Sequence, residues 1–124
     1  MQTRRSALAF TGAIGALSLA GQSFGQAKYP DQPVKIIVAL PAGGGVDVIA
    51  RNLAQRMSAD LGQPFLVDNR AGGSGQIGMP AVAKAAPDGY TLTVSPASFL
   101  STNKSIFKNL PYDPEADFDR SHAW

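Results

Sequence analysis

Two glycine-rich segments are the part of this 124-residue sequence best suited to chemistry, residues 41–45 and residues 69–75. Each follows an apolar run and precedes a segment with helical spacing. Backbone N–H groups at the start of a helix have no intrahelical acceptor and carry the positive end of the helix dipole. Glycine has no Cβ, so an anionic ligand can approach such a backbone closely. Each segment is a candidate anion site, and the alternative is that its glycines only make a tight turn between strand and helix.

The second segment contains a dinucleotide-binding pattern, because residues 73–78 read Gly-x-Gly-x-x-Gly. A nicotinamide site also requires an acidic residue about 20 positions further on, at the end of the next strand. Residues 94–97 occupy that place and read Val-Ser-Pro-Ala, with no acid. Neither glycine run continues into the Gly-Lys-Ser/Thr of a phosphate-binding P-loop. We therefore expect no nucleotide cofactor.

Side chains that could catalyse a reaction are few. The chain has no cysteine, its one histidine is His122, and its one glutamate is Glu115. A Ser-His-Asp triad or a histidine-rich metal centre cannot be built from the body of such a chain, so we expect no catalytic residues and no metal. The aspartates lie mostly at expected turns and helix ends, where they cap. Arg70 is a candidate partner for a ligand carboxylate, or for Asp68 in a surface ion pair.

Alternating elements must position the glycine segments. Apolar, β-branched runs predict strands at residues 34–40, 65–67 and 90–94, and the nearly continuous run at 34–40 is typical of a strand buried on both faces. Helices are predicted at residues 46–61 and 77–86, with a short one at 98–107. The first helix carries an apolar stripe and closes at Gly62, and its stripe has seven members: Val46, Ile49, Ala50, Leu53, Ala54, Met57 and Leu61. Strands alternating with helices predict an α/β fold with a doubly wound, mostly parallel sheet.

The first 27 residues have the pattern of a secretory signal peptide. Arg4 and Arg5 precede an apolar run at residues 7–20, and small residues follow at Gly25 and Ala27. The run is shorter than the roughly 20 residues that cross a bilayer. Both the general and the twin-arginine export routes fit the arginine pair. Removing Arg4 and Arg5 from the 11 basic residues leaves nine against nine acidic ones, so the exported chain is neutral and we expect no nucleic-acid partner.

Five blocks in chain order resemble the substrate-binding receptors of tripartite tricarboxylate transporters, the Bug family. The blocks are residues 29–38, 41–51, 68–78, 83–92 and 110–114. The resemblance covers residues 29–118 and implies a portion of a type II periplasmic binding protein-like lobe. It also implies a small carboxylate ligand, such as a di- or tricarboxylate or an amino acid, with a membrane permease as partner of the full-length receptor.

The resemblance further implies that backbone N–H groups of residues 42–47 hold the ligand carboxylate, with residues 69–75 and 95–98 lining the same cleft. Asn103 matches a family asparagine. The positions that this assigns to ligand binding are Ala42, Gly43, Gly44, Gly45, Asp47, Asn69, Gly72, Gly73, Ser74, Gly75, Ser95 and Ser98.

Residues 119–124 depart from the family pattern, where family members cross into a second lobe. This predicts three parts: a signal peptide at 1–27, a first-lobe portion at 28–118 and a divergent tail at 119–124. A frameshift or early stop would explain such an ending, and we expect weak or no binding without a second lobe. A fragment of an exported α/β enzyme acting on an anionic substrate is the alternative to a periplasmic receptor fragment.

Overall fold

The computed structural model describes residues 28–118, in which strands and helices alternate as expected. The predicted signal peptide at 1–27 and the divergent tail at 119–124 lie outside the described residues. None of the helices within residues 28–118 combines the length and the apolar character needed to cross a membrane.

Three parallel strands form one sheet in the order β2-β1-β3. They are β1 (Val34–Val38), β2 (Phe65–Asn69) and β3 (Thr91–Thr93). In the register, Ile36 of β1 lies opposite Val67 on one side and Leu92 on the other. The parallel α/β sheet is confirmed, but β1 and β3 are shorter than predicted. Strand β2 is longer, because its pairing with β1 continues through the polar residues Asp68 and Asn69.

Five helical segments accompany the sheet within residues 28–118. They are α1 (Gly45–Leu61), the 3-10 turn η1 (Gly73–Gly75), α2 (Gly78–Ala83), α3 (Ser98–Ser101) and α4 (Asn103–Ile106). Gly62 ends α1 in the left-handed conformation, and its N–H donates to the Ser58 carbonyl at 3.1 Å, as expected for a helix C-cap. The predicted helix at 77–86 is shorter, and the single helix predicted at 98–107 is divided at Thr102 into α3 and α4.

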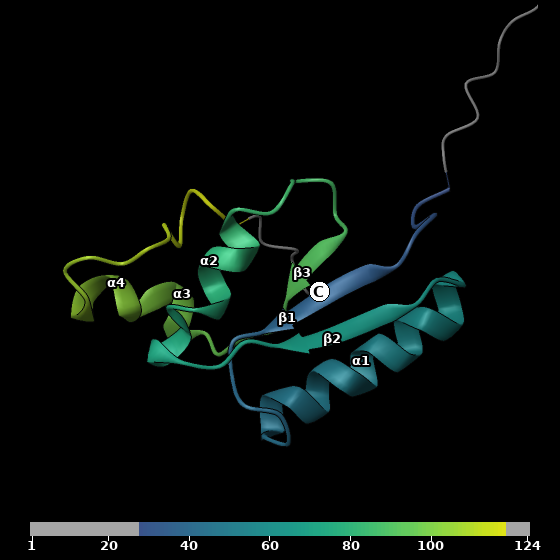
Figure 1. Cartoon of the computed structure of the whole chain (residues 1–124), viewed down its shortest axis with the longest axis horizontal. Coiled ribbons are helices and arrows are strands. Elements are labelled where there is room, and N and C mark those ends of the chain that lie inside the picture. Colours follow the sequence, from purple (N-terminus) through teal and green to yellow (C-terminus); the bar gives the residue numbers. More distant parts are fainter. Residues whose placement is uncertain (1–27, 119–124) are drawn as a thin grey trace, which may run out of the picture.

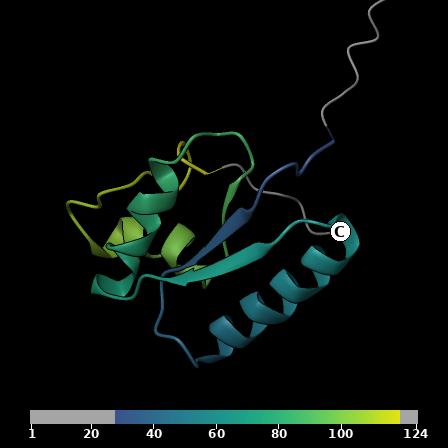
Figure 2. The ribbon, with the colours of Figure 1, turned by 45° about the vertical axis from the view of Figure 1, so that its right-hand side comes forward.

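Two apolar cores lie on opposite faces of the sheet, because side chains alternate along β1. Val34, Ile36 and Val38 pack with Ala50 and Ala54 of α1. On the other face, Ala39 packs with a cluster from α2, α3 and the segment after α4, which consists of Met79, Phe99 and Tyr112. Figures 1 and 2 show α1 on one side of the sheet and α2, α3 and α4 on the other. The sheet is therefore covered on both faces, as a doubly wound fold requires.

The apolar stripe of α1 is only partly covered. Ala50 and Ala54 are buried, whereas Ile49 is 61% and Leu53 42% exposed. Leu53 lines an open hollow of about 380 Å³ beside β3, together with Leu92 and Phe118. Three strands are too narrow to cover the whole stripe, so sequence periodicity alone overestimates how much of it is buried.

We expect Ile36→Ala to lower the free energy of unfolding by about 2–5 kcal/mol, because it leaves a cavity in the centre of the sheet. Ile49→Ala removes the same atoms from an exposed position on α1 and should change it by less than about 0.5 kcal/mol. Urea unfolding followed by circular dichroism measures both. Equal losses in the two variants would contradict the packing described above.

Candidate functional site

Three loops meet at one edge of the sheet because all three strands are parallel and end there. The first loop, residues 39–44, connects β1 to α1, and the second, residues 70–77, connects β2 to α2 and includes η1. The third, residues 94–97, follows β3. The first loop is bonded to the end of β2, directly before the second loop, since the Asn69 side-chain amide donates to the Leu40 carbonyl at 3.2 Å. The candidate positions from all three loops therefore share one edge.

The first loop presents bare backbone at the start of α1. Gly44 is the N-cap and has an extended conformation, with no side chain capping the helix. Val48 N–H is bonded to the Gly44 carbonyl at 3.1 Å, so the N–H groups of the three residues before Val48 have no acceptor within the helix. Ala42, Gly44 and Gly45 are exposed. An anion can therefore reach the positive end of a 17-residue helix without displacing a side chain.

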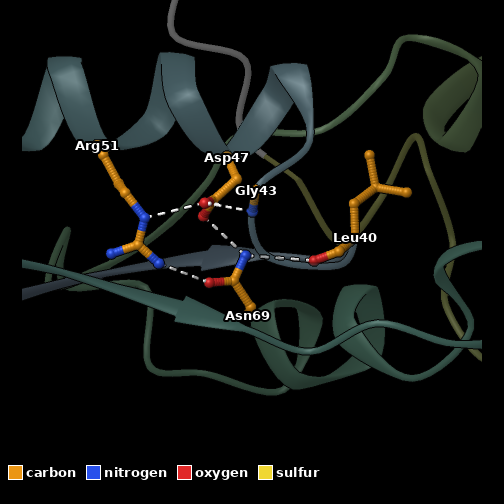
Figure 3. Close-up of polar contacts among 5 residues, drawn as sticks. All are labelled: Leu40, Gly43, Asp47, Arg51 and Asn69. Carbon is orange, nitrogen blue, oxygen red and sulfur yellow. Dashed lines mark hydrogen bonds and ion pairs between the residues drawn. The ribbon is translucent and has the colours of Figure 1, made fainter.

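The side chain of Asp47 holds this loop in place (Figure 3). Its Oδ2 accepts hydrogen bonds from Gly43 N–H and from Arg51 Nε, both at 2.9 Å. Its Oδ1 accepts one from Asn69 Nδ2 at 2.9 Å. Arg51 also donates from Nη2 to Asn69 Oδ1 at 3.0 Å, which closes a ring of three side chains. Gly43 has a φ of +85°, a conformation that favours glycine.

These hydrogen bonds determine the charge of Asp47. The guanidinium of Arg51, the Gly43 N–H and the Asn69 amide lower the pKa of Asp47 to about 2, against the opposing effect of its burial. Asp47 is therefore ionised at neutral pH. Its two oxygens and the side-chain amide of Asn69 are already bonded within the protein. Both side chains thus shape the loops, and the expected contact of Asp47 and Asn69 with a ligand stays a prediction, in which Asp47 takes part through its backbone N–H.

The second loop has an exposed part and a buried part. Gly72 and Gly73 are exposed and have positive φ angles, as does the exposed Ser74. Gly75 is buried, and a Cβ built on it would lie 2.6 Å from Cδ2 of Phe99. This burial leaves Gly75 little surface for a ligand, and its contact with one stays a prediction. It is a glycine because the Phe99 ring packs directly against its backbone.

A second buried polar side chain, Asn103, holds this loop through a hydrogen bond to its backbone. Asn103 is 5% exposed, and its Nδ2 donates to the Ser74 carbonyl at 2.9 Å and to the Tyr112 hydroxyl at 3.1 Å. The Tyr112 hydroxyl donates in turn to the Phe99 carbonyl at 2.7 Å. Asn103, which the resemblance singled out, thus fixes the second loop through its backbone.

The remaining candidate side chains are less constrained. Ser95 is half-buried and Ser98 exposed, both directly after β3. Of the two partners considered for Arg70, the structure shows Asp68, whose Oδ2 lies 3.0 Å from the Arg70 Nε. Within residues 28–118, no three histidine, cysteine, aspartate or glutamate side chains are grouped closely enough to hold a metal ion.

Two important residues were missed by sequence reasoning. Arg51 is not among the candidates, although its spacing of four from Asp47 is the spacing of helical ion pairs. Tyr112 lies in the block at residues 110–114, but no local pattern shows that its hydroxyl meets Asn103.

A family profile described as "Tripartite tricarboxylate transporter family receptor" matches residues 49–121. Among curated proteins, the chain is similar to Protein BugT of Bordetella pertussis, with 48% identity over 85 residues. That similarity covers 68% of this chain and 26% of BugT, so the chain spans about a quarter of the length of this relative.

Solved structures agree with this result. The periplasmic binding protein BugD superposes with a TM-score of 0.65 and 40% identity, covering 73% of this chain and 30% of BugD. MatC from Rhodopseudomonas palustris with bound malate superposes with a TM-score of 0.68 and 36% identity, covering 73% of this chain and 31% of MatC. The chain thus has the fold of part of a periplasmic binding protein.

Gly75→Ala should lower the free energy of unfolding by about 1–3 kcal/mol, because the new methyl group meets Phe99 and φ is +92° there. Gly45→Ala is the matched control: nothing lies within 4 Å of its added Cβ. It should leave stability unchanged or raise it by less than about 1 kcal/mol. Thermal unfolding compares the two, and a Gly75 variant as stable as the Gly45 variant would contradict the packing against Phe99.

Acid should weaken the protein through Asp47. The folded-state pKa of about 2 is below the ordinary value of 3.8, so the stabilisation by this carboxylate is complete above about pH 4 and lost as pH falls toward 2. We expect Asp47→Asn to be less stable than wild type at pH 6, with the difference shrinking at pH 2.5. Asp60→Asn removes an exposed carboxylate from the same helix and serves as control. A constant difference between wild type and Asp47→Asn from pH 6 to pH 2.5, measured by urea unfolding, would argue against the linkage.

Proposed function

The chain belongs to the tripartite tricarboxylate transporter receptor family, and from that premise we propose that it supplies part of an extracytoplasmic binding site for a small carboxylate. The observation that carries the proposal is the uncapped start of α1, exposed at the edge where all three loops meet. MatC, a relative of the same fold, has been solved with bound malate. Carboxylate binding in that protein supports the same ligand class here.

In the proposed site, the ligand carboxylate accepts hydrogen bonds from the N–H groups of Gly45, Val46 and Asp47 at the start of α1. The exposed backbone of residues 72–74 forms a second wall. The hydroxyls of Ser95 and Ser98 can accept or donate hydrogen bonds to the other polar groups of the ligand. A cradle made of backbone recognises a carboxylate group but distinguishes little between the acids that carry one.

Periplasmic location and delivery to a membrane permease follow as further parts of the proposal. BugD, which superposes on this chain, is a periplasmic binding protein. The basic, apolar and small-residue pattern of residues 1–27 supports export through a signal peptide, by either route. Because the chain spans about a quarter of BugT, these roles are proposed for a receptor of family length. The relatives are binding proteins, and they lend no support to the alternative of an enzyme acting on an anionic substrate.

Malate titration of the 124-residue chain, followed by amide NMR, tests the site. We expect saturable shifts confined to residues 43–47, 72–74 and 95–98. The affinity should be only millimolar, because hydrogen bonds from a few exposed N–H groups compete with water.

Gly45→Glu is the test variant, since it places a negative charge at the start of α1 and should abolish these shifts. Asn52→Glu adds the same charge at an exposed position further along α1 and should keep them. If malate shifts other residues, or if both variants respond alike, the proposed location of the carboxylate is wrong.

A further inference from the structure

We infer that Arg51 is a positioning and charge-compensating residue of the proposed carboxylate site, although it does not belong to the glycine loops themselves. This inference rests on the proposed function. The N-terminus of α1 has a buried carboxylate in its first turn, and Arg51 explains how it can nevertheless accept an anion.

Arg51 connects α1 to the end of β2, beside the first loop. Its Nε lies 2.9 Å from Asp47 Oδ2 within α1, and its Nη2 lies 3.0 Å from Asn69 Oδ1 at the end of β2. The Arg51 side chain is 56% exposed and that of Asp47 4%. The guanidinium therefore bonds the buried carboxylate of Asp47 and the side-chain amide of Asn69 while remaining in contact with solvent. This arrangement suits its planar, forked donor geometry.

The ring of bonds fixes the direction of the first loop. Gly43 N–H points inward to Asp47 Oδ2 at 2.9 Å, so the backbone turns there and Gly44 becomes the N-cap of α1. Asn69 bonds both Asp47 and the Leu40 carbonyl, which ties the same loop to β2. Losing Arg51 would leave Asp47 with two neutral donors and Asn69 Oδ1 without its bond to the guanidinium.

Charge compensation is the second effect. A carboxylate in the first turn of a helix uses up the favourable interaction with the helix dipole that an anionic ligand would otherwise gain. Asp47 is in that position, and Arg51 is the only charged side chain that contacts it among residues 28–118. The pairing cancels the negative charge locally, so the start of α1 keeps a positive potential for the ligand.

Three variants of the 124-residue chain separate these effects. Arg51→Gln removes the charge and the fork, and Arg51→Lys keeps the charge alone. Arg56→Gln removes an exposed charge from the same helix, at a position with no ion pair within the described residues, and is the matched control. For each we measure the Asp47 pKa by carboxyl NMR, hydrogen exchange at the Gly43 amide, and the malate-induced shifts.

In Arg51→Gln we expect the pKa of Asp47 to rise toward its ordinary value of 3.8 and the Gly43 amide to exchange faster. Malate affinity should fall about two- to fivefold, the effect of one unpaired charge at a helix terminus. Arg51→Lys should restore most of the affinity, because compensation needs the charge more than the fork. Arg56→Gln should match wild type in all three measurements.

The outcomes distinguish this inference from the proposed function. If Arg51→Gln behaves like Arg56→Gln in the Asp47 pKa and in Gly43 exchange, the positioning role is wrong. If malate affinity is the same in Arg51→Gln as in wild type although the Asp47 pKa rises, charge compensation is wrong. Absence of malate shifts in the wild-type chain would contradict the proposed function, whereas a raised Asp47 pKa and faster Gly43 exchange in Arg51→Gln would still support the positioning role.

Discussion

The carboxylate of Asp47 is the interaction on which the rest of the site depends. It is buried where β1 passes into α1, and it is bonded by the backbone of Gly43, the guanidinium of Arg51 and the amide of Asn69. A buried carboxylate without such donors would be costly, so its partners are required for the fold as well as for the site. By accepting these bonds inside the protein, Asp47 leaves the backbone at the start of α1 open to the outside.

Both glycine loops expose backbone at the same edge of the sheet, but different side chains hold them in place. In the first, a side chain of the helix bonds back to the loop, and Gly44 and Gly45 remain exposed. In the second, the Asn103 side chain donates a hydrogen bond to the Ser74 carbonyl, and Phe99 covers Gly75. Buried polar groups therefore shape both loops, and the exposed surface of each is mostly backbone. This division explains why the edge suits an anionic group better than an apolar one.

Part of the apolar surface that residues 28–118 leave uncovered lies along α1 and beside β3. Ile49 and Leu53 are exposed on the helix, and Leu53, Leu92 and Phe118 line the same open hollow. BugT and MatC are three to four times as long as the matched part of this chain, as their coverage of 26% and 31% shows. The described residues thus have the architecture of one part of such a receptor, with the edge that we propose for carboxylate binding formed and one flank of the sheet open.

The sequence by itself determined the fold class, the parallel strands, the C-cap at Gly62 and the family, because these depend on local periodicity, glycine chemistry and motif order. It also indicated that both glycine segments follow strands, which in a parallel sheet places them at one edge. Only the tertiary structure decided which groups face the edge. Gly75 looks like its neighbours in sequence, yet Phe99, 24 positions later, covers it. Asp47 and Asn69 carry polar side chains typical of ligand contacts, but they bond each other across 22 residues, and Asn69 also bonds Arg51 across 18. Such pairings are decided by how β2 docks beside β1, a long-range contact that no local pattern of residues contains.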